Sequence, residues 1–92
     1  MTGTNANVGG YKAVSASGNV CAFPCNLLGI WVSNAASTPT ITLYDDAATG
    51  TGTVLSAVWT PTSGTWYNIP ASLGKGLNVV ISGTVAATVI FA

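Results

Sequence analysis

Apolar and polar residues alternate along several short segments of this chain. In TITLYD, Ile41 and Leu43 alternate with threonine and tyrosine. In LNVVIS, the apolar positions Leu77, Val79 and Ile81 again fall on every second residue. A period of two places such side chains on one face of an extended strand. The pattern therefore predicts half-buried β-strands.

Seven segments have this strand character: Tyr11–Ser17, Cys25–Ser33, Thr40–Asp45, Thr53–Trp59, Thr65–Ile69, Leu77–Ser82 and Thr84–Phe91. Clusters of Gly, Pro, Asn, Asp and Ser, such as NAASTP and SGT, lie between them and favour turns. The segment PASLGKG is compatible with one helical turn before Gly74, as a minor exception to the β pattern. The spacing predicts an all-β, antiparallel fold of about seven to eight short strands, arranged as a β-sandwich, a jelly roll or a small barrel.

The first ten residues, MTGTNANVGG, lack this pattern and are predicted to form an extended N-terminal arm. Residues 11–92 are then one β-sandwich domain, because a chain of 92 residues has room for a single core. No basic and apolar leader and no Asn-x-Ser/Thr sequon is visible, so we expect synthesis in a cytosol.

Charged residues are rare: Lys12, Lys75, Asp45 and Asp46 are the whole set, and His is absent. The lysines form no cluster for nucleic acid, and no apolar run reaches the roughly 20 residues of a membrane span. We therefore expect this chain to bind no nucleic acid and to insert into no membrane. A soluble monomer depends on interspersed surface charges. Their scarcity indicates a protein that packs against copies of itself or against a larger scaffold.

Asp45 and Asp46 are the first candidates for chemistry. Neighbouring side chains on a strand point to opposite sides, whereas catalytic carboxylates face each other across a substrate. Turn initiation at the strand end is the favoured interpretation, and a bound cation or a polar contact between subunits stays open. A Ser or Cys nucleophile needs a general base, and no imidazole is available for this role because His is absent. We expect no enzyme, no catalytic or metal site and no cofactor.

Cys21 and Cys25 enclose AFP. Two reduced, partly buried thiols are the favoured interpretation. A local disulfide is the alternative, and it requires a turn at Phe23 and Pro24 because an extended segment of this length separates the two Cα atoms too far.

The aromatic residues are candidates for an interface or for the core. Trp59, Trp66 and Tyr67 surround the hairpin WTPTSGTWY. Trp31 and Trp59 are expected to fill the core, and a sugar-stacking platform of exposed rings is the alternative. The candidate interface residues are Tyr11, Trp59, Trp66, Tyr67, Asp45 and Asp46.

Residues 27–91 resemble the small all-β structural proteins encoded among the virion genes of tailed bacteriophages. The resemblance lies in the order of four features: an apolar strand with Gly, ITLYD followed by a small-residue loop and GTVL, then WYNIP, then GLNVVISGT. It implies a capsid decoration (cement) protein, or a head-fibre or tail component, with a β-sandwich or jelly-roll fold. No functional residue is transferred with it.

The resulting hypothesis is a non-enzymatic virion protein that is made in the host cytoplasm, self-associates and binds the outside of a capsid shell. Its partners are then the major capsid protein or another virion protein, and further copies of itself as a dimer or trimer. The arm and the DDAATGTG loop are expected to contribute contacts. A carbohydrate-binding β-sandwich module is the alternative.

Overall fold

The computed structural model describes residues 10–47 and 52–92. Within these ranges the chain forms strands and no helix. The strands are β1 (Gly10–Val14), β2 (Gly18–Cys21), β3 (Cys25–Asp45), β4 (Thr53–Trp59), β5 (Thr65–Leu73) and β6 (Leu77–Phe91).

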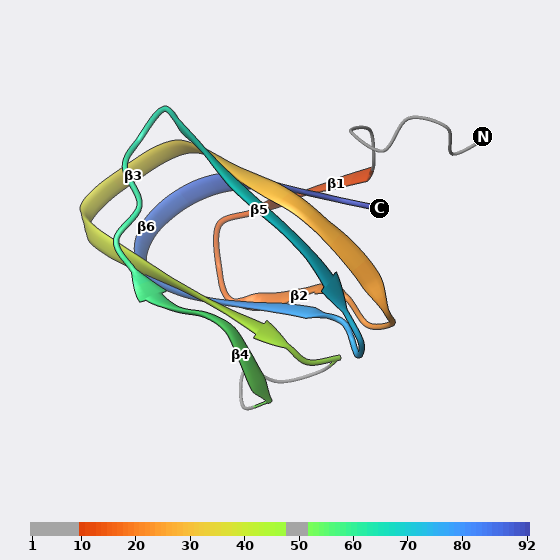
Figure 1. The fold of residues 1–92 in the computed structure, drawn as a ribbon. Coiled ribbons are helices and arrows are strands. Elements are labelled where there is room, and N and C mark those ends of the chain that lie inside the picture. Colours follow the sequence, from red (N-terminus) through yellow and green to blue (C-terminus); the bar gives the residue numbers. More distant parts are fainter. Residues whose placement is uncertain (1–9, 48–51) are drawn as a thin grey trace.

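The two longest strands, β3 and β6, form the centre of the sheet (Figure 1). They pair antiparallel from Leu27 opposite Phe91 to Asp45 opposite Leu77. β5 and β4 pair with the first and last parts of β3. β2 and β1 pair with the first and last parts of β6. The described strands therefore make one antiparallel sheet, in which β1, β2, β4 and β5 are edge strands.

Both central strands bend near the middle of their shared ladder. Ser37 and Thr38 have φ angles of 63° and 48°, and Gly83 on β6 has a φ of 90°. The register shifts between Ala36 and Thr40, where Pro39 packs against Gly83. Figure 1 shows that one half of the sheet doubles back over the other as a result. We call these halves the β1–β5 half and the β2–β4 half.

The core lies between the two halves. Its fully buried aliphatic side chains come from both ends of β3 and β6, with Leu73 from β5. The alternation identified in the sequence is the cause, since every second side chain of each strand faces the opposite half. The largest of these side chains are Leu27, Ile30, Ile41, Leu43, Leu73, Leu77, Val32, Val79 and Val89.

The prediction of an all-β antiparallel fold is confirmed, and residues 10–47 and 52–92 form six strands in place of the seven to eight predicted. Cys25–Ser33 and Thr40–Asp45 were predicted as separate strands, and both belong to β3. Leu77–Ser82 and Thr84–Phe91 likewise both belong to β6. The clusters NAASTP and SGT shift the register and bend the two strands without ending them. The sandwich or jelly-roll arrangement stays a prediction.

Two smaller predictions were wrong, and a third concerns residues that the structure does not describe. The strand predicted for Tyr11–Ser17 ends at Val14, and Gly18–Cys21 is a strand that the pattern missed. The helical turn considered in PASLGKG is absent, because β5 continues to Leu73. The predicted arm falls almost wholly outside the described residues, and Gly10 is the first residue of β1.

The bend generates a test at Gly83. A Cβ there would meet the Pro39 Cα at 2.8 Å, on a backbone that side chains rarely adopt. We expect Gly83→Ala to lower the free energy of unfolding by about 1–3 kcal/mol. Gly18→Ala is the matched control, because a Cβ at Gly18 has no neighbour within 4 Å. Urea unfolding of both variants measures the difference, and equal stabilities would contradict the strained bend.

Candidate functional site

The sequence-predicted acidic pair lies where β3 ends, beside the turn between β5 and β6. The Asp45 carboxylate accepts hydrogen bonds from three successive backbone N–H groups, those of Gly74 at 3.2 Å, Lys75 at 2.9 Å and Gly76 at 3.3 Å. The Asp46 N–H donates to the Gly76 carbonyl at 3.2 Å. We call Asp45, Asp46 and Gly74–Gly76 the acidic corner. Its contacts join two turns about thirty positions apart in the sequence.

Hydrogen bonding lowers the pKa of the Asp45 carboxyl. The N–H of Lys75 is the largest influence and lowers the pKa of this carboxyl. The N–H groups of Gly74 and Gly76 and the Lys75 charge act in the same direction, while partial burial opposes them. Donors that bind the charged form stabilise it, so Asp45 is held as a carboxylate.

Amide side chains extend the acidic corner across the sheet. Asn78 on β6 is 4% exposed and donates to the Asn19 side-chain oxygen on β2. Asn19 in turn donates to the carbonyl of Ala47, which follows the acidic pair. The buried polar group is thereby satisfied, and the β2–β4 half is tied to the segment that leaves β3.

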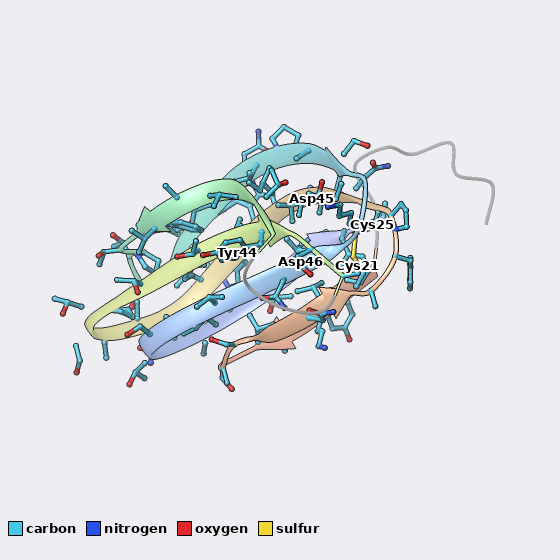
Figure 2. All side chains as sticks on the ribbon, turned by 90° about the horizontal axis from the view of Figure 1, so that it is seen from below. Cys21, Cys25, Tyr44, Asp45 and Asp46 are labelled. Carbon is cyan, nitrogen blue, oxygen red and sulfur yellow. A yellow bond between two sulfur atoms is a disulfide. The ribbon has the colours of Figure 1, made fainter. Side chains whose placement is uncertain are left out.

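A disulfide joins Cys21 to Cys25 beside this corner (Figure 2). Bends at Ala22 and Phe23 bring the two residues together. The interpretation of reduced thiols was therefore wrong, and the alternative with a turn in AFP holds. Leu77 connects the two features, since it pairs with Cys21 on one side and with Asp45 on the other.

The contacts of the acidic corner form a structural clamp, because they hold the end of β3 against the turn between β5 and β6. Among the described residues, no three His, Cys, Asp or Glu side chains gather as a metal-binding group. Asp45 was expected to initiate a turn within its own segment, and it binds the turn that connects β5 to β6. No pattern along the chain pairs residue 45 with residues 74–76, which explains why sequence reasoning missed this partner. Residues 48–51 of the DDAATGTG loop lie outside the described ranges.

Two of the predicted aromatic residues lie together and face inward. Trp59 on β4 and Tyr67 on β5 make an edge-to-face contact with ring centroids 5.7 Å apart. Both are partly buried against the core. The Tyr67 hydroxyl also accepts the Thr62 N–H at 2.8 Å. This pair joins the two halves along the side formed by β4 and β5.

Trp66 and Tyr11 are exposed on the outer side of the β1–β5 half, and Trp31 accompanies them. Trp66 is 45% exposed and lies opposite Trp31, which is 42% exposed. Tyr11 is 73% exposed. The expectation that Trp31 fills the core was wrong, because its neighbours Ile30 and Val32 occupy the inward positions. The exposed indoles are thus Trp31 and Trp66, while Trp59 and Tyr67 close the interior.

We compared the chain with known protein families, curated proteins and solved structures. No protein family model, no curated protein and no solved structure matches the chain. The described residues also include no helix that is long and apolar enough to cross a membrane. Arguments about function therefore depend on the residues themselves.

The acidic corner predicts an acid-sensitive stability. The pKa of Asp45 is lowered in the folded chain, so its contribution is present above the unfolded value of about 3.9 and is lost as pH falls through the folded value. Asp45→Asn should lower stability at neutral pH and flatten the decline between about pH 5 and pH 2. Urea unfolding across this range measures both effects.

Lys75→Gln is the control for this experiment. It keeps the backbone N–H that contributes most to the shift and removes only the side-chain charge. The variant should retain most of the acid-dependent decline. A decline in Asp45→Asn equal to that of the wild type would contradict the assignment of the clamp to this carboxylate.

Proposed function

We propose that this chain is a non-enzymatic structural subunit, a capsid decoration protein that self-associates and binds the outer surface of a tailed-phage shell. The observation that carries the proposal is the surface: large apolar side chains face outward in a chain with four charged residues. The exposed large hydrophobic residues are Tyr11, Phe23, Trp31, Val54, Val58 and Trp66.

Asp45 and Lys12, two of the four charged residues, form hydrogen bonds with other parts of the same chain. The Asp45 carboxylate binds the turn at Gly74–Gly76. The Lys12 ammonium donates to the Asn19 carbonyl at 2.7 Å, from β1 to β2. Soluble monomers usually keep about a quarter to a third of their surface residues charged. The scarcity of charges here supports a chain whose surface is covered by copies or by a scaffold.

Attachment to a shell works through repetition in this proposal. Each subunit contributes a modest apolar contact, and many copies on one scaffold raise the overall avidity without stronger individual contacts. Since few ion pairs are available, attachment depends weakly on salt. The doubled-over sheet serves as a β-sandwich whose outer sides meet the partners, and the major capsid protein is the proposed shell contact.

A carbohydrate-binding module, on a tail or fibre component, is the second candidate. The exposed pair Trp31 and Trp66 supports it, because indole faces stack on sugar rings. Trp59, Trp66 and Tyr67, the rings around WTPTSGTWY, do not lie on one surface, since Trp59 and Tyr67 pack inward. This leaves a smaller platform and makes the structural role the stronger proposal.

Particles from a culture that produces this chain test the leading proposal. A tagged copy should co-sediment with the shells, bind antibody on intact particles and remain attached at about 1 M salt, where the Debye length is about 3 Å. Shells that lack the chain should open at lower temperature. A soluble protein with the same tag controls for trapping. Sedimentation of the chain apart from shells at low salt would contradict the proposal.

A further inference from the structure

We propose that a second copy of this chain packs on the outer side of the β1–β5 half, with the same surface of both copies in contact across a two-fold axis. This inference rests on the proposed function, because it assigns the self-association to one surface. The surface, called the aromatic face, consists of Tyr11, Ala13, Gly29, Trp31, Trp66, Asn68, Thr88 and Ile90.

The strand register brings these residues together. Residues directly opposite in antiparallel strands share one side of the sheet. Trp31 lies opposite both Trp66 and Thr88, and Thr88 lies opposite Ala13. The next row runs through Asn68, Gly29, Ile90 and Tyr11. Two adjacent rows across four strands therefore form a continuous surface.

Trp66 is held in place on this surface. A Cβ on Gly29 would collide with carbons of the Trp66 indole, so the ring lies directly against the Gly29 backbone. The side chain is nevertheless 45% exposed. An indole fixed before association loses little conformational freedom when a partner covers it, which favours binding. Trp and Tyr are also the residue types that most often dominate interface energies.

Association through the strand edges is disfavoured. β1 carries Lys12, and β2 has four residues and a register shift. β4 has two register shifts against β3. In β5, Pro70 lies within the shift between the pairs Leu27 with Ala71 and Gly29 with Asn68. Lysine, proline, short strands and bulges all hinder the addition of another strand. A face is therefore the better route to self-association.

The absence of charge on the aromatic face favours a second copy as the occupant. A two-fold axis brings identical residues close together, so charged side chains near it would repel each other. None of the eight residues of this face is charged. Tyr11, Trp31 and Trp66 are 73%, 42% and 45% exposed, which amounts to roughly 300 Å² of aromatic surface at about 150–250 Å² per ring. That is more than a third of the about 800 Å² that each partner of a stable complex buries.

Sedimentation velocity of the purified chain over a wide micromolar range tests the inference. The wild type should be a dimer, and Tyr11→Lys should raise its dissociation constant at least tenfold by placing like charges at the interface. Val54→Lys is the matched control, since Val54 is 51% exposed and is also the second residue of an edge strand, on the other half. It should leave the dissociation constant unchanged. Circular dichroism confirms the fold of each variant, and Trp31→Ala provides a second variant that adds no charge.

Several results would overturn the inference. They are a monomeric wild type, a dimer that Val54→Lys dissociates and Tyr11→Lys does not, and a monomer whose tryptophan emission shifts on adding a neutral hexasaccharide. The last result identifies a carbohydrate as the occupant. Retention on particles is read separately: a dimer through this face that does not co-sediment with shells upholds the inference and contradicts the proposed function. A monomer that is retained on shells contradicts the inference and the self-association, and upholds the binding to shells.

Discussion

The antiparallel ladder between β3 and β6 is the interaction on which the other features depend. It runs the length of both strands and bends at Ser37, Thr38 and Gly83, so the same two strands supply both halves of the structure. The bend places Leu27 and Ile41, from opposite ends of β3, in one core. Because the remaining strands each pair with only one of these two, they are edges whose positions follow from the ladder.

This arrangement separates two kinds of surface. At one end of the ladder, the Asp45 carboxylate and the Asn78 and Asn19 amides are used to join turns and strands within the chain. On the outer side of the β1–β5 half, Trp31 and Trp66 remain exposed. One carboxylate and two amides thus bond within the chain, while two indoles face outward. A typical soluble monomer instead carries many charged side chains on its surface.

The period-two pattern was sufficient to predict the strand class and several core residues, among them Ile41, Leu43 and Val79. It was not sufficient for the continuity of β3 and β6, because Gly83 and its neighbours form a bend with the composition of a turn. Trp31 was assigned to the core because large aromatic side chains commonly fill one. The register shift between Leu27 and Gly29 lies just before Ile30 and Val32, which face inward and leave Trp31 on the outer side. The partners of Asp45 could not be predicted, since they depend on how two distant turns meet.

The central claim is that the exposed rings of this chain are covered in its native assembly. Hydroxyl-radical footprinting of the assembly and of the dilute chain compares the solvent access of individual side chains directly. The account predicts that Tyr11, Trp31 and Trp66 are oxidised in the dilute chain and protected in the assembly, while Phe23 changes less. Equal oxidation of the three aromatic residues in both samples would contradict it.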